Sequence, residues 1–150
     1  MKNLYEPTTA QEVKDRLARL HPDSQRQWGS MTVAQAVAHC ATSMEWAVGD
    51  RVPDRMYASR ILGVLVKPFV FRDDKPMRPN SPTAKSLLIH DHRNLQAESL
   101  RLLTLIDRFT AARAQGCTTN PHSFFGRLTP DEWAILMYKH LDHHLRQFGA

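Results

Sequence analysis

The sequence predicts an all-α protein: residues 1–150 form a single four-helix-bundle domain, with a long crossover connection between the second and third helices. Apolar residues recur at helical spacing in four stretches, and helix-start signals precede several of them. Strand signals are few, and 150 residues is the size of one ordinary domain. The alternative architecture is an orthogonal helical domain built from the same elements.

The first two helices are predicted from capping boxes. Thr9 and Glu12 form one box, and the apolar residues that follow predict a helix over 9–20, ended by Pro22. Thr32 and Gln35 form the second box, and Gly49 is a good C-terminal stop for a helix over 33–48. Its apolar stripe is Val33, Val37, Cys40, Met44 and Val48.

Five prolines interrupt residues 49–86, which makes this connection harder to interpret. Residues 55–66 could form a short helix, and residues 70–83 have the composition of an irregular loop. Such a long connection is uncommon unless it packs over something or serves a site.

The last two helices have clearer signals. An apolar stripe predicts a helix over about 91–115, ended by Gly116; it comprises Leu95, Leu102, Ile106 and Phe109. The sequence Thr-Pro-Asp-Glu at 129–132 combines an N-cap residue, a proline in the first turn and early acidic residues. It predicts a helix over 130–147.

Composition excludes several classes of protein. Hydrophobic residues make up 42% and charged residues 23%, as in ordinary globular domains. The longest apolar run, residues 61–66, is far shorter than a membrane span, and we expect neither a membrane segment nor a signal peptide. Cys40 and Cys117 form no paired motif, so we expect free thiols and a cytoplasmic location.

Most of the net charge of +5 falls within residues 51–78, where seven Lys or Arg residues face three Asp residues. Such a segment can attract anionic partners, although a solvated loop is the simpler interpretation. No RNA-binding or zinc-finger pattern accompanies it, so we do not expect nucleic acid to be a partner.

The chemistry of this chain is expected at its histidines. On the last predicted helix, Trp133, Met137, His140 and His144 fall within about 80° of arc at the centre of the apolar face. Neutral imidazoles four residues apart can both reach one divalent ion. A histidine pair of this spacing is also common without a metal. No Glu follows His140, so the general base of the zincin motif is missing.

Two neighbours of this pair are expected to lie outside it. His143 projects to one side and is interpreted as a surface residue or a donor to a ligand residue. Asp142 points away from the apolar face, which predicts a solvated charge.

A third ligand could come from several histidines, namely His21, His39, His90, His92 and His122. His39 lies inside the second predicted helix, on a face of mixed character beside the apolar stripe, as in a pocket wall. A partly exposed histidine without a ligand role is an equal alternative. The side chains predicted to wall a substrate pocket are Gln35, Ser43, Trp46, Trp133 and Met137.

Three segments of the chain resemble the DinB/YfiT-like superfamily of metal-dependent enzymes, and more closely an uncharacterised bacterial family within it. They are SMTVAQAVAHC at 30–40, PHSFFGRLTPDEW at 121–133 and YKHLDHHLRQFG at 138–149. The resemblance implies a four-helix bundle, often dimeric, that holds zinc or nickel through three histidines. By position these are His39, His140 and His144. His122 follows Pro121 where the family pattern has His before Pro, which places any role of His122 in doubt.

Better-known relatives in this superfamily are thiol-dependent S-transferases and a maleylpyruvate isomerase, which use low-molecular-weight thiols. A divalent ion with three neutral ligands lowers the pKa of a bound water or thiol toward 7, which suits hydrolysis or thiol transfer of a small-molecule substrate. The missing Glu favours the thiol route, while Cys40 is interpreted as a core residue. The alternative is a non-catalytic bundle that binds a metal or an anion.

Overall fold

The computed structural model describes residues 1–54, 59–81 and 83–150, and within these ranges the chain is all-α, as predicted. The described part contains no strand, only one isolated bridge between His122 and Gly126. Its five α-helices are α1 (Pro7–Leu17), α2 (Val33–Val48), α3 (Ser59–Val70), α4 (Leu95–Ala112) and α5 (Pro130–Gln147). Two short 3-10 helices, η1 (Lys85–Leu87) and η2 (Arg113–Gly116), lie between them.

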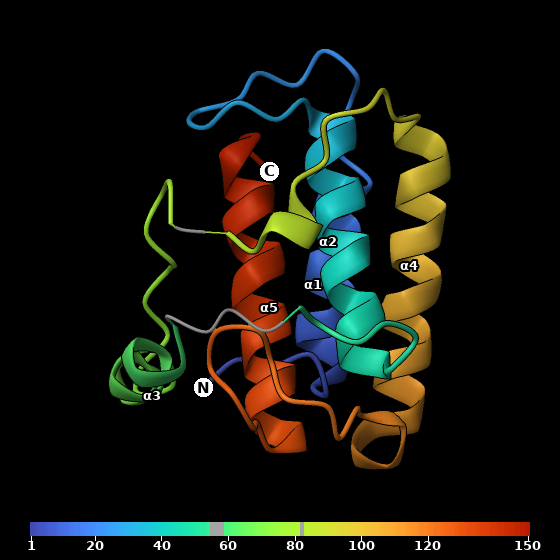
Figure 1. Cartoon of the computed structure of the whole chain (residues 1–150). Helices are drawn as coiled ribbons and strands as arrows, with labels where there is room; N and C mark the ends of the chain where they lie inside the picture. The colour runs from blue at the N-terminus through green and yellow to red at the C-terminus, as the bar shows by residue number, and fades with distance from the viewer. Residues whose placement is uncertain (55–58, 82) are drawn as a thin grey trace.

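Helix α2 packs against both α4 and α5, and α1 contacts the same two helices (Figure 1). Apolar side chains from these four helices fill the space between them, and the largest of them are fully buried: Met44, Trp46, Phe109 and Trp133. Helix α3 lies to one side of these four helices, and its Val66 and Val70 pack against the core. In the described ranges, no helix is long and apolar enough to cross a membrane.

The boundaries of α2 and α5 are as predicted. Thr32 and Thr129 each accept a hydrogen bond from the backbone N–H three residues on, and the Gln35 and Glu132 side chains bind back to the caps. Gly49 ends α2 in the left-handed conformation, at φ 83°. These local signals were strong enough to fix where both helices that carry the predicted metal ligands begin.

The predicted capping box at Thr9 is wrong. Helix α1 begins two residues earlier, at Pro7, and the Thr9 hydroxyl instead donates to the Glu6 carboxylate at 3.0 Å. The helix also ends at Leu17, short of the predicted residue 20. Proline suits the first turn of a helix, where its missing N–H costs nothing.

The third predicted helix is shorter than expected, because Asn94 caps α4 through the Ala97 N–H and the last turn changes to the 3-10 helix η2. The possible helix over 55–66 corresponds in part to α3, although residues 55–58 lie outside the described residues. Helix α3 continues through Pro68 to Val70. Residues 71–81 and 83–84 are then irregular, close to the predicted loop over 70–83, of which residue 82 lies outside the described residues.

The long connection is held to α5 by a buried lysine. The Lys139 ammonium group donates to the backbone carbonyl oxygens of Val70, Asp73 and Lys75. The chain then reaches η1, which contacts α2. The connection therefore runs across the side of the molecule where α2 and α5 face each other (Figure 1).

Candidate metal centre

Helices α2 and α5 run antiparallel, and their facing side chains meet in layers. His39 pairs with His140, and one turn further Ser43 donates its hydroxyl hydrogen to the Met137 sulfur at 3.7 Å. Each layer closer to the C-terminus of α2 is therefore closer to the N-terminus of α5. This arrangement brings histidines that are 101 residues apart in sequence to the same level of the molecule.

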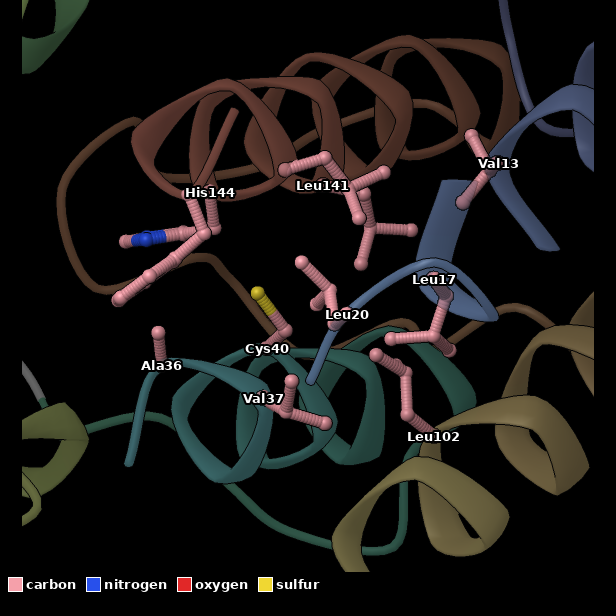
Figure 2. A pocket seen from close by; sticks show the side chains of 11 residues that line it. Val13, Leu17, Leu20, Ala36, Val37, Cys40, Leu102, Leu141 and His144 are labelled. Atoms are coloured by element: carbon pink, nitrogen blue, oxygen red, sulfur yellow. The ribbon is translucent and has the colours of Figure 1, made fainter. Parts of the chain in front are cut away.

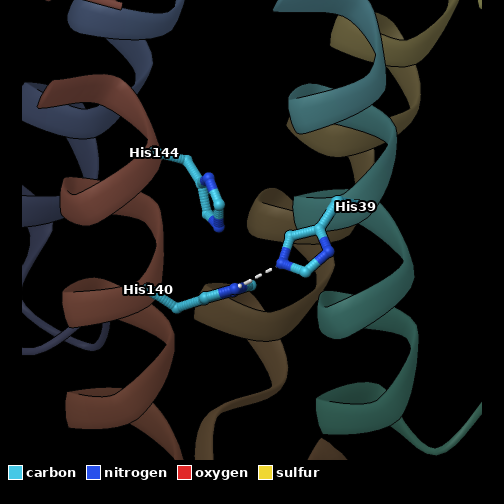
Figure 3. A group of neighbouring side chains, drawn as sticks. All are labelled: His39, His140 and His144. Atoms are coloured by element: carbon cyan, nitrogen blue, oxygen red, sulfur yellow. Dashed lines mark hydrogen bonds between the residues drawn. The ribbon is translucent and has the colours of Figure 1, made fainter. Parts of the chain in front are cut away.

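His39, His140 and His144 form one cluster, with His39 on α2 facing the other two on α5 (Figure 3). One ring nitrogen from each residue lies within 4.8 Å of those of the other two. The ring centroids are 4.6 to 4.8 Å apart. His39 is only 2% exposed, while His140 and His144 are half-buried. Within the described ranges, only these three residues belong to such a group.

The backbone of η1 fixes the protonation of His39. Its Nδ1 lies 2.8 Å from the carbonyl oxygen of Leu87, which can only accept a hydrogen bond. Nδ1 therefore carries the hydrogen, and in the neutral ring Nε2 presents a lone pair to the cluster.

A side chain on α5 does the same for His144. Its Nδ1 lies 2.8 Å from the Gln147 side-chain oxygen, which accepts its hydrogen. The Nε2 atom of His144 is thereby left as an acceptor. Two of the three rings are held in the tautomer that a metal bound through Nε2 requires.

The third ring closes the cluster through a hydrogen bond. His140 Nε2 lies 2.8 Å from His39 Nε2, and since His39 Nε2 has no hydrogen, His140 donates. Metal binding through His140 Nε2 would therefore require this hydrogen to move to Nδ1. No charge has to leave the site, because both tautomers are neutral.

All three imidazoles are held neutral. Burial is the main cause that lowers the pKa of His39, and it lowers the pKa of His144 to about 3. Burial also lowers the pKa of His140 well below its ordinary value of 6.5, and its two neighbouring histidines lower it further. At pH 7 the cluster is therefore a set of three uncharged nitrogen ligands.

The donor set fits a divalent ion. Nitrogens about 2.1 Å from one ion in tetrahedral geometry lie about 3.4 Å apart. The 2.8 Å contact between His39 and His140 is shorter than this, so the two rings would separate by about 0.6 Å. Three neutral ligands would leave the ion its full charge and further coordination positions, as in catalytic zinc sites.

Comparison with known proteins identifies the family. A family model described as Protein of unknown function (DUF1569) matches residues 4–150, nearly the whole chain. The chain belongs to the DUF1569 family. No curated protein and no solved structure matches it. The site of this DUF1569 protein must therefore be interpreted from its own geometry.

The two other residues of interest on α5 lie outside the cluster. The buried His143 ring contacts the Trp28 ring at a tilt of 52°, and its Nδ1–H donates to the carbonyl oxygen of Met77 at 3.3 Å. The prediction that Asp142 is solvated is wrong, because this carboxylate is 4% exposed. It accepts hydrogen bonds from Arg16 on α1 and from Arg146, so it joins two helices.

The remaining candidate ligands are elsewhere. His21, His90 and His92 are exposed and absent from the cluster. His122 instead lies between the Trp46 and Trp133 rings, beyond the layer of Ser43.

Backbone groups of the turn before α5 hold the His122 ring. Its Nδ1 accepts hydrogen bonds from the backbone N–H groups of Phe124 and Phe125, at 3.1 and 3.3 Å. Burial lowers its pKa to about 4. The ring therefore organises the turn before α5 as a neutral acceptor.

The residues predicted to wall a substrate pocket are placed as follows. Gln35 caps α2 and donates to the Asp91 carbonyl oxygen at 3.1 Å. The other four, Ser43, Trp46, Trp133 and Met137, are buried side chains stacked on one side of the cluster. A role of these residues in substrate binding stays a prediction.

A small apolar cavity borders the cluster on the side of α1 (Figure 2). His144 lines it together with the Cys40 thiol, and hydrocarbon side chains supply the other walls. Burial raises the pKa of Cys40, so this thiol is a protonated core group, as predicted. Burial also raises the pKa of Cys117, which leaves no activated thiol among the described residues.

The charges of the basic segment, residues 51–78, are partly paired. Lys67 contacts Glu132, Arg51 contacts Glu45, and Asp73 lies near Arg72 and Lys75. Residues 55–58 of this segment lie outside the described residues. That the segment favours an anionic co-substrate stays a hypothesis.

Two groups that hold the cluster were missed from sequence. Gln147 is three residues after His144, and this spacing makes neighbours on a helix, so a signal was present. No sequence pattern predicts the contact between the Leu87 carbonyl oxygen and His39, because the position of Leu87 depends on how the long connection folds back onto α2.

Proposed function

We propose that this protein is a divalent-metal-dependent enzyme that holds one ion through His39, His140 and His144. The observation that carries the proposal is the pair of hydrogen bonds on the far side of the rings. Leu87 and Gln147 each take the Nδ1 hydrogen of one histidine, so both Nε2 lone pairs face the third ring. A cluster of packing histidines has no need for two rings fixed in the same tautomer.

Zinc or nickel is the ion that the donor set supports best. Imidazole nitrogens are preferred ligands of both ions, and no carboxylate joins the group in the described ranges, which argues against magnesium or calcium. The resemblance to the DinB/YfiT-like bundles points to the same two metals.

The reaction class we propose is group transfer to or from a low-molecular-weight thiol, with hydrolysis of a small molecule as the second possibility. When bound, a divalent ion supplies a positive charge that lowers the pKa of a coordinated thiol or water. The chain's own residues keep three imidazoles neutral and aligned, and the packed layer of Ser43 and Met137 excludes water on one side. Among the residues that the structure describes, no acidic side chain joins the cluster, which supports the thiol route over a base-assisted attack of water.

The test is metal analysis of purified protein and of matched alanine variants. We expect about one zinc or nickel ion per chain in the wild type, and loss of the ion in His140→Ala and His144→Ala. His143→Ala is the control, because this ring touches that of His144 but gives its hydrogen bond to Met77 and is not one of the three grouped ligands. Circular dichroism establishes that each variant keeps its helices.

Retention of the metal in His140→Ala would refute the assignment. If the metal is lost but no thiol transfer or hydrolysis is found with a panel of thiols, esters and amides, the protein is a metal-binding bundle without turnover. A rise in the melting temperature of the wild type with added zinc, absent in His144→Ala, gives an independent measure of binding.

A further inference from the structure

Gln147 uses every polar part of its side chain, although it is 2% exposed and lies at the end of α5. Its side-chain oxygen accepts the Nδ1 hydrogen of His144 at 2.8 Å. Its amide nitrogen donates to the carbonyl oxygen of Trp28, also at 2.8 Å. The residue therefore connects a candidate metal ligand to the loop between α1 and α2.

The Trp28 contact decides which way the amide faces. If the amide were turned over, its oxygen would meet the Trp28 carbonyl oxygen and its N–H groups would meet the His144 N–H. Both contacts would be unfavourable, so the observed orientation is the one in which all groups are satisfied. The loop thereby fixes the acceptor that sets the tautomer of His144.

The loop is shaped to hold this amide. Gln27 N–H donates to the backbone oxygen of Gln147 at 2.7 Å, which fastens the loop to the end of α5. Gly29 follows at φ 78°, and a Cβ atom there would lie 2.7 Å from the Gln147 amide nitrogen. A residue with a side chain at position 29 would therefore displace the amide, so the close approach requires glycine.

We propose that Gln147 is a positioning residue for His144, fixed by the loop of residues 27–29, and that this loop controls the metal affinity of the cluster without touching the ion. The inference rests on the proposed metal site. Groups that hold the far nitrogen of a histidine ligand typically change metal affinity by about 10- to 100-fold when they are removed.

The experiment measures zinc and cobalt affinity of the full-length protein by competition with a chelator, and records the visible spectrum of the cobalt form. Gln147→Met keeps the length of the side chain but removes the acceptor, and is expected to weaken metal binding by about 10-fold or more. Gln147→Glu keeps an acceptor for the His144 hydrogen but loses the donor to the Trp28 carbonyl oxygen, and is expected to lose less affinity than Gln147→Met.

Gly29→Ala tests the loop from the other side, because it changes neither His144 nor Gln147. It is expected to weaken metal binding and to alter the cobalt spectrum in the same direction as Gln147→Met. Gly126→Ala is its matched control: Gly126 has a similar φ of 70°, but a Cβ atom there meets nothing within 4 Å. This variant has comparable backbone strain and should keep the wild-type affinity.

Three results would overturn the inference while leaving the metal site intact: wild-type affinity in Gln147→Met, equal losses in Gln147→Glu and Gln147→Met, or equal losses in Gly29→Ala and Gly126→Ala. A wild-type protein that binds no zinc or cobalt at all would instead refute the proposed function. Melting temperatures of the metal-free variants separate loss of affinity from loss of folding.

Discussion

Acid should unfold the metal-free protein because folding buries histidines in the neutral form. The pKa of His122 is about 4 and that of His144 about 3 in the folded chain, against an ordinary value of 6.5, and burial is the main cause in each case. Between pH 6.5 and about pH 4, the unfolded chain therefore binds more protons than the folded chain. Stability that is fully present above pH 6.5 is lost as the pH falls.

The size of this loss follows from the two shifts. Each pH unit below 6.5 lowers the free energy of unfolding by about 1.4 kcal/mol for each histidine that stays neutral in the folded chain. From pH 7.5 to pH 5, His122 and His144 together remove about 4 kcal/mol from the free energy of unfolding. His39 and His140, whose pKa values burial also lowers, add to the loss. Since domains of this size are stable by about 5–15 kcal/mol, the effect is large.

The assay is urea unfolding of the metal-free protein at pH 7.5 and pH 5, followed by circular dichroism. His122→Asn is the informative variant, because His122 is outside the metal cluster and asparagine can still accept a backbone hydrogen bond. Between pH 7.5 and pH 5, the free energy of unfolding of this variant should fall by about 2 kcal/mol less than that of the wild type. His21→Asn, at an exposed histidine, controls for the substitution. Equal losses in His122→Asn and the wild type would refute the reasoning.

Three further predictions concern the rest of the fold. Lys139→Met should lower the free energy of unfolding by about 2 kcal/mol and speed hydrogen exchange in residues 71–77, because three carbonyl oxygens lose their donor. Unchanged hydrogen exchange would contradict this prediction. Thr129→Ala should lower the free energy of unfolding by about 1 kcal/mol in urea titrations, through loss of the cap of α5, and an unchanged midpoint would argue against it. The wild type should sediment as a homodimer and Leu65→Glu as a monomer, because Leu65 lies among apolar side chains exposed on α3. A monomeric wild type would contradict this prediction.

Helix boundaries were predictable where a single local signal dominated. Thr32 and Thr129 each stand alone before an apolar stripe, and both cap their helices as predicted. Thr9 failed because Pro7 competes with it: proline in the first turn moved the start of α1 upstream, and Glu6 took the Thr9 hydroxyl. Two start signals within three residues cannot be ranked from the sequence alone.

The candidate site was predictable only in part. Helical spacing placed His140 and His144 together, but the choice of His39 came from the family resemblance, because its helix face was ambiguous. Asp142 was misjudged because the helical wheel treats the side opposite the apolar face as solvent. In the structure Arg16 of α1 covers that side and pairs with the carboxylate at 2.7 Å. Such pairing depends on tertiary packing and leaves no local signal.

The hydrogen bond between His140 and His39 explains how three imidazoles can be clustered without an ion. Three buried rings that were all fixed with Nε2 lone pairs facing inward would leave three acceptors unpaired, at a substantial cost in free energy. Within the described ranges, only His39 and His144 have an acceptor for a hydrogen on Nδ1, so His140 can donate its hydrogen across the cluster. The same burial that makes the fold sensitive to acid keeps the rings neutral at pH 7. Metal uptake therefore requires the His140 hydrogen to move from Nε2 to Nδ1, and no proton has to leave the site. The acid sensitivity and the readiness to bind metal therefore have one physical cause.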